Sequence, residues 1–143
     1  MKTAGSMIDL LKDLIKIESD TKEGANEALL FCSEWLKAHG EDVEVHDNDG
    51  YLMLTAAKGR GDDKIIWNGH VDVVPGRKEQ FSPVVEGDKL YGRGSADMKA
   101  GVAGMMQAFI ELDAAALPRE VHLHIVTDEE TGGHHTSEWL VDQ

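Results

Sequence analysis

Three apolar, strand-like runs of this 143-residue sequence each end in a histidine or in carboxylates. The segments at these ends read NGHVDVVP (68–75), YGRGSADMK (91–99) and TDEETGG (127–133). Carboxylates gathered at one place repel one another and would be driven to protonate unless cations neutralise them. The grouping therefore predicts bound metal, and metal-dependent hydrolysis is the first interpretation.

Hydrophobic periodicity predicts the elements that carry these segments. Apolar side chains recur at helical spacing over 8–15 and again over 28–36, before Gly40 as a C-terminal cap. Residues 43–57 alternate around a tight turn at 48–50 and predict a hairpin. The run at 64–67 predicts a strand covered on both faces by helices, residues 98–117 a helix closed by Pro118, and residues 121–126 a further strand. This order predicts one α/β domain with a mixed β-sheet flanked by helices.

The two ends of the sequence carry separate expectations. Residues 136–141 look like the start of a helix whose apolar face is unfinished at Gln143. We therefore expect residues 8–143 to be the N-terminal part of something longer. Residues 1–7 are expected to hold a cloning remnant, read from Gly5-Ser6-Met7, with Met7 as the natural start.

Composition excludes some classes of partner. Lys and Arg number 14 against 27 Asp and Glu, and the net charge of −13 argues against binding to phosphate backbones. The sequence has neither a secretion signal nor a run of about 18 apolar residues, so no membrane partner is expected. The single cysteine, Cys32, falls on the apolar face of a predicted helix, where a buried, inert thiol is expected. These features predict a cytoplasmic protein and no nucleic-acid partner.

The first segment pairs His70 with Asp72. Side chains two residues apart in a strand share a face, and a metal-bound imidazole usually donates its second N–H to a carboxylate. On its own, a His-x-Asp pair would more often be a histidine that forms a hydrogen bond at a strand end. The two other acidic segments favour the metal-ligand interpretation.

The second segment places Asp97 at the mouth of a glycine-rich loop. The dinucleotide-binding pattern requires a third glycine at the position that Asp97 occupies, and no Lys-Ser or Lys-Thr follows the loop. A phosphate-binding loop is therefore disfavoured. Asp97 suits direct metal coordination, although a helix N-cap is the commoner role of such an aspartate. We interpret Arg93 and Lys99 as solvated or paired with neighbouring acids.

In the third segment, Glu129 and Glu130 are consecutive, so they diverge in extended geometry and are expected to perform different tasks. One could bind metal while the other handles protons. The alternative is a solvated acidic turn. His134 and His135 follow two glycines and are expected in an exposed loop.

Together, GHVDVVP (69–75), YGRG with DMK (91–94, 97–99) and DEE (128–130) resemble the acetylornithine deacetylase, succinyl-diaminopimelate desuccinylase and carboxypeptidase family of co-catalytic metallohydrolases. The resemblance covers nearly all of 8–143. It implies that these residues form the N-terminal portion of a zinc-peptidase-like catalytic domain, truncated at its C-terminal side. The substrate it implies is a small N-acyl amino acid or peptide.

The resemblance also implies roles for individual residues. His70 would bind one zinc ion, Asp97 would bridge two, Glu130 would bind the other, Asp72 would orient His70, and Glu129 would act as general base. Mixed imidazole and carboxylate ligation suits Zn²⁺, with Co²⁺ or Mn²⁺ as substitutes.

The sequence departs from the family in what it lacks. Relatives supply a further carboxylate ligand, a further histidine and a dimerisation domain from later positions, so a homodimer is expected only of the full-length protein. The 143-residue chain alone is expected to be inactive. A non-catalytic metal-binding or interaction fragment, and a peptidase of the same family, remain as alternatives.

Overall fold

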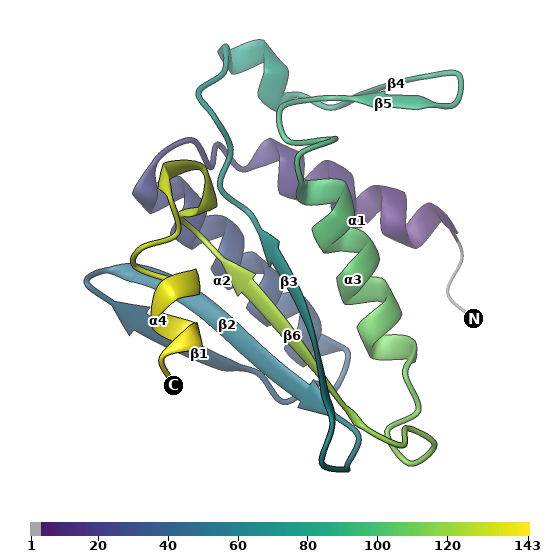
Figure 1. Cartoon of the computed structure of the whole chain (residues 1–143). Helices are drawn as coiled ribbons and strands as arrows, with labels where there is room; N and C mark the ends of the chain where they lie inside the picture. Colours follow the sequence, from purple (N-terminus) through teal and green to yellow (C-terminus); the bar gives the residue numbers. More distant parts are fainter. Residues whose placement is uncertain (1–3) are drawn as a thin grey trace.

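The computed structural model describes residues 4–143 and confirms an α/β fold (Figure 1). Its elements are α1 (Ala4–Lys16), α2 (Lys22–Ala38), β1 (Glu44–Asn48), β2 (Tyr51–Lys58), β3 (Lys64–His70), the 3₁₀ helix η1 (Lys78–Phe81), β4 (Val84–Glu86), β5 (Lys89–Tyr91), α3 (Lys99–Glu111), β6 (Glu120–Val126), the 3₁₀ helix η2 (Glu129–Thr131) and α4 (Ser137–Val141). Residues 1–3 of the predicted remnant lie outside the described residues. The assignment of residues 1–7 as a remnant stays a prediction.

The main sheet has four strands in the order β1-β2-β6-β3. β1 and β2 pair antiparallel, as do β2 and β6, whereas β3 runs parallel to β6. This confirms the mixed β-sheet. β4 and β5 form a separate two-stranded hairpin that stands beyond the end of β3 (Figure 1).

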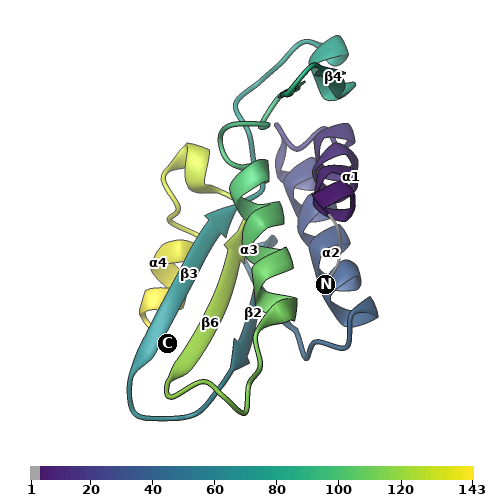
Figure 2. The ribbon, with the colours of Figure 1, turned by 90° about the vertical axis from the view of Figure 1, so that its right-hand side faces the viewer.

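Three helices cover one face of the sheet. Figure 2 shows α1, α2 and α3 on this face and the short α4 on the opposite one. The core between sheet and helices consists of apolar side chains from both layers, among them Leu14, Leu29, Leu36, Leu54, Met106, Phe109, Leu123 and Ile125. These residues occupy the positions that the helical and alternating patterns predict, so burial of the apolar faces explains both layers.

Local sequence chemistry fixes the predicted turn and caps. Asp49 and Gly50 both adopt positive φ, at 57° and 78°, as a two-residue hairpin turn requires. The Thr21 side chain accepts a hydrogen bond from the Gly24 N–H at the start of α2. Gly40, at φ 86°, follows the end of that helix and confirms the predicted C-terminal cap.

The predicted helix over 98–117 is too long, because α3 ends at Glu111. Lys58 Nζ donates to the Phe109 carbonyl at 2.9 Å and to the Leu112 carbonyl at 3.4 Å, which satisfies acceptors at the end of the helix. The Asp113 side chain then accepts from the Ala115 N–H in a turn. The apolar periodicity of the sequence continues past Glu111, whereas the end of α3 depends on Lys58 from β2.

The prediction that helices cover both faces of the 64–67 strand is also wrong. Ile66 is 58% exposed and Ile65 is exposed as well. β3 is an edge strand of the described sheet, and its first residues extend past the helices that cover its neighbours. Within residues 4–143, no helix has the length and apolar character to cross a membrane.

Candidate metal centre

Two parallel strands bring the first and third segments to one edge of the sheet. β3 pairs with β6 so that His70 lies beside Val126, and both strands end at this point. Loops that follow the carboxyl ends of neighbouring parallel strands meet in space, which is where open α/β sheets hold their ligands. The fold therefore places His70 next to the acidic segment at 128–130.

His70 is buried and makes a different contact from each ring nitrogen. Nδ1 lies 2.9 Å from the main-chain oxygen of Asp72 and 3.4 Å from the Asp72 carboxylate. Because a carbonyl oxygen only accepts, Nδ1 carries a proton. In the neutral ring, Nε2 then presents a lone pair, and it lies 3.1 Å from Asp97 Oδ1 and 3.4 Å from Glu129 Oε2. A lone pair that faces carboxylates calls for a proton or a metal ion between them.

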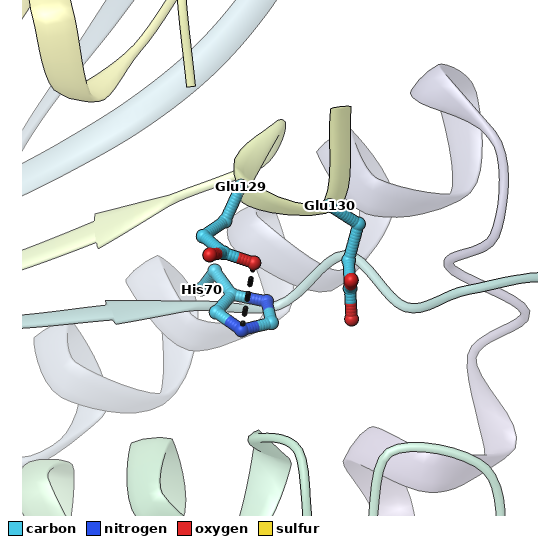
Figure 3. A group of neighbouring side chains, drawn as sticks. All are labelled: His70, Glu129 and Glu130. Atoms are coloured by element: carbon cyan, nitrogen blue, oxygen red, sulfur yellow. Dashed lines mark ion pairs between the residues drawn. The ribbon is translucent and has the colours of Figure 1, made fainter. Parts of the chain in front are cut away.

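The two glutamates lie on η2, above the imidazole. Figure 3 shows His70, Glu129 and Glu130 facing a common space, and one ligand atom from each lies within 4.8 Å of the others. The Glu130 N–H donates to Asp72 Oδ2 at 2.8 Å, so the buried Asp72 carboxylate contacts both the histidine and the glutamate segment. Asp97 contacts His70 but is not part of this three-residue group.

The pKa values of His70 and Glu130 reflect the crowding of negative charge. Burial opposes the charged form of His70, but hydrogen bonds to Asp72 and the charges of Asp72 and Glu129 outweigh it and raise the pKa to about 9. For Glu130, burial and the neighbouring Asp97 carboxylate raise the pKa against the opposing charge of His70. The shift of His70 shows that its surroundings favour a positive charge on the ring, whereas the shift of Glu130 is caused first by burial and then by the neighbouring carboxylates.

The donor set fits zinc. One imidazole nitrogen and several carboxylate oxygens are the ligand types that Zn²⁺ takes in hydrolytic sites. The side chains of Asp97 and Glu129 are 76% and 53% exposed, so the space is open on one side to an incoming molecule. The five residues predicted for the site thus lie together. Their separate roles stay predictions.

Sequence reasoning missed the part played by Asp128. Its carboxylate accepts from the His135 N–H at 2.8 Å and from the Thr136 hydroxyl. Its main-chain oxygen accepts from the N–H groups of Thr131 and Gly133. Asp128 therefore fixes the turn that carries the two glutamates, a role that its place at the head of an Asp-Glu-Glu run does not reveal.

The interpretation of Lys99 as solvated or paired with an acid is wrong. Lys99 is fully buried, and its Nζ donates to the carbonyls of Leu14 and Ile17 at the end of α1. Arg93 forms no ion pair with any carboxylate in the described part of the chain. A lysine at the start of α3 can satisfy the carbonyls of another helix only through the tertiary fold, so its local sequence gave no signal.

The histidines that follow the glycines lie outside the metal group. His134 is exposed and pairs with Glu138 at 3.0 Å, whereas His135 stacks on Tyr51 at 4.2 Å. A Cβ on Gly69, directly before His70, would lie 2.4 Å from the terminal methyl group of Met105, so the Met105 side chain would have to move to make room for it. Close packing of α3 behind this glycine holds the end of β3 in place.

The sequence matches known proteins over most of its length. Residues 66–143 match the model of peptidase family M20/M25/M40. The chain is 35% identical over 136 residues to succinyl-diaminopimelate desuccinylase of Bordetella parapertussis, which covers 90% of this chain and 36% of that protein. It is 31% identical over 138 residues to acetylornithine deacetylase of Photorhabdus laumondii, covering 87% of this chain and 36% of that protein. The chain thus spans little more than a third of these relatives.

Solved structures share the fold. Human carnosine dipeptidase 1 superposes with a TM-score of 0.77 at 23% identity, covering 96% of this chain and 35% of that one. An M20 family metallo-carboxypeptidase from Sulfolobus solfataricus gives a TM-score of 0.76 at 24% identity, covering 89% and 32% of the two chains. At this level of identity the structural likeness concerns the fold.

Proposed function

Because this chain belongs to peptidase family M20/M25/M40, we propose that it forms part of a zinc-dependent hydrolase that cleaves the amide bond of an N-acyl amino acid or a small peptide. The observation that carries the proposal is the buried imidazole of His70, whose Nε2 faces Asp97 and Glu129. Glu130 completes the acidic surroundings.

In this proposal, His70, Asp97 and Glu130 hold two Zn²⁺ ions, for which Co²⁺ or Mn²⁺ can substitute. Bound zinc supplies a Lewis acid that polarises a carbonyl and lowers the pKa of water. The buried Asp72 positions His70 through its main-chain oxygen and its carboxylate. Glu129, whose side chain is open to solvent, acts as the general base. It accepts a proton from the attacking water and then donates that proton to the departing amine.

Two kinds of substrate fit the proposal. The curated relatives are named for removing succinyl and acetyl groups, which favours an N-acyl amino acid. The solved structures that share the fold are named as a dipeptidase and a carboxypeptidase, which supports a peptide as the second candidate. Either reaction breaks an amide C–N bond with the same set of side chains.

A metal titration tests the site in the 143-residue chain. Calorimetry with Zn²⁺ should detect binding that H70A and D97A each weaken about 10- to 100-fold, since each removes a ligand. H134A is the matched control, because His134 lies in the same loop region but pairs with Glu138. Equal binding by all four proteins would show that the ion does not sit at His70.

The reaction is tested in the longer polypeptide, because we propose that this chain alone lacks a carboxylate and a histidine that complete the site. Loaded with Zn²⁺ or Co²⁺, it should hydrolyse at least one of N-acetylornithine, N-succinyl-diaminopimelate and a dipeptide. E129Q should retain metal and lower kcat by about 10²- to 10⁴-fold, the contribution of a general base. Absence of turnover on all three, with metal content verified, would refute the proposed reaction.

A further inference from the structure

A polar cavity is lined by residues around η1 and by the first half of the second segment, 91–99. Its volume is about 440 Å³, and its lining includes Arg77, Glu79, Gln80, Tyr91, Arg93 and Ser95. η1 and β5 contribute Glu79, Gln80 and Tyr91, whereas Arg77 directly precedes η1, and Arg93 and Ser95 lie in the loop after β5. η1 and the β4–β5 hairpin stand beyond the end of β3 in Figures 1 and 2, at the same end of the sheet as His70, the last residue of β3.

This segment differs in charge from the rest of the chain. Residues 76–95 contain four basic and three acidic side chains, whereas the protein as a whole carries 14 basic and 27 acidic ones. Of the two arginines in the cavity, neither pairs with a carboxylate in the described part of the chain, including Glu79 of the same lining. A locally positive surface on an acidic protein attracts anions to one place and repels them elsewhere.

Arg93 has more donors than acceptors around it. A guanidinium offers five N–H donors, yet the Arg93 side chain makes one long contact, from a terminal nitrogen to Gln80 Oε1 at 3.5 Å. That oxygen already accepts from the Arg77 N–H at 2.8 Å. Arg93 Nε is buried without a hydrogen-bond partner. An unpaired guanidinium in a cavity is the arrangement that an oxyanion satisfies.

The cavity and the metal centre share one loop. The Arg93 N–H donates to the Gln80 carbonyl at 2.7 Å and ties this loop to η1. Ser95 lines the cavity, and two residues later Asp97 contacts His70. One short loop therefore supplies a residue to the lining of the cavity and a residue to the metal centre.

We propose that Arg93 and Arg77 form a carboxylate-binding pocket that holds the free carboxylate of a dicarboxylic acyl group, while the amide of the same substrate lies at the metal centre. The identity of the ligand as substrate rests on the proposed function. The affinity of the pocket for a carboxylate is independent of the proposed function, because binding of a carboxylate there requires neither metal nor turnover.

The binding test uses the ¹⁵N-labelled 143-residue chain and succinate as the probe. The Arg93 Nε–Hε signal should shift with a dissociation constant of about 1 mM, the range that a charge-assisted contact to one guanidinium supports. R93K should weaken binding about tenfold, because the ammonium lacks the planar fork of donors. R60K is the control, since the exposed Arg60 lies outside the cavity.

Other outcomes of this titration would overturn the proposal. They are the absence of any shift at Arg93 in a folded protein, equal affinity of R93K and wild type, or inorganic phosphate binding at least as tightly as succinate. The last result would assign the pocket to phosphate.

A kinetic test in the longer polypeptide separates this proposal from the proposed function. R93K should raise KM for an N-succinyl substrate about tenfold more than for its N-acetyl analogue, because only the former has the extra carboxylate. R60K should change the KM of neither substrate. If no substrate is turned over, the proposed function fails, and the succinate titration alone then decides on the pocket.

Discussion

At the scale of single residues, His70 shows how a main-chain contact sets the chemistry of a side chain. The spacing of His70 and Asp72 predicted a contact between their side chains, and that contact is present at 3.4 Å. The shorter contact, at 2.9 Å, is to the Asp72 carbonyl, and it determines which ring nitrogen holds the proton. Side-chain spacing predicted the partner, whereas the tautomer depends on the backbone path after β3.

A second histidine, His124, should make stability sensitive to acid. It is half-buried on the sheet face that α4 partly covers, and no carboxylate pairs with it in the described residues. Burial, together with the charges of His122 and His46, lowers its pKa below 6.5. His122 pairs with Glu120 at 2.8 Å, and His46 lies 3.9 Å from Glu44.

The direction in which pH changes the stability follows from the difference in proton binding between the folded and unfolded states. Below about pH 6.5 the unfolded chain takes up a proton at His124 before the folded protein does, so the contribution of His124 is intact above this pH and is lost as the pH falls. Urea unfolding at about pH 7 and about pH 5.5 should show H124N losing less stability than wild type over this range. H134N, at an exposed position, should follow wild type. Parallel losses in H124N and wild type would contradict the lowered pKa.

At the scale of elements, one largely buried ion pair links β2 and α3 to the loop between α2 and β1. Lys58, at the end of β2, contacts Glu41 at 2.7 Å, and the two side chains are 14% and 10% exposed. The same ammonium donates to carbonyls at the end of α3. Removing it leaves a buried carboxylate and those carbonyls without a partner.

K58M should therefore lower the free energy of unfolding by about 3 kcal/mol, measured by urea denaturation. In K58M/E41Q part of this loss should return, because no charge is then left unpaired. K64M is the matched control: Lys64 is exposed and lies 3.9 Å from Glu120, so its loss should cost less than about 0.5 kcal/mol. Equal effects of K58M and K64M would argue against the buried pair.

Local patterns predicted most elements and failed where tertiary contacts decide. The helices up to Gly40 and the hairpin over 43–57 follow from apolar periodicity and from turn residues at 48–50. The end of α3 depends on Lys58, and the burial of Lys99 depends on the end of α1, so neither was predicted. The β4–β5 hairpin was missed as well, although Gly87-Asp88 between the short runs VVE (84–86) and KLY (89–91) is a turn signal.

At the scale of the whole molecule, the sheet has an open edge. β3 is the outermost strand after β6 in the described sheet, and Ile65 and Ile66 are exposed at its start. An exposed apolar edge strand offers unpaired main-chain groups and side chains to another chain.

The 143-residue chain should therefore self-associate as its concentration rises, which sedimentation velocity detects. I66K should shift the protein towards monomer, because a lysine on an edge strand opposes pairing. L30K is the control, since Leu30 is an exposed apolar residue on α2, away from the edge. Association that L30K suppresses and I66K leaves intact would place the contact on the helical face.

The convergence of β3 and β6 has a consequence for the chain as a polymer. Asp97 lies 27 residues after His70, and Glu130 comes from the far side of α3 and β6. An ion held by all three would act as a crosslink that closes two long loops and reduces the entropy of the unfolded ensemble. Zinc bound there would therefore stabilise the tertiary structure as well as support the proposed reaction, and a chelator would remove both contributions at once.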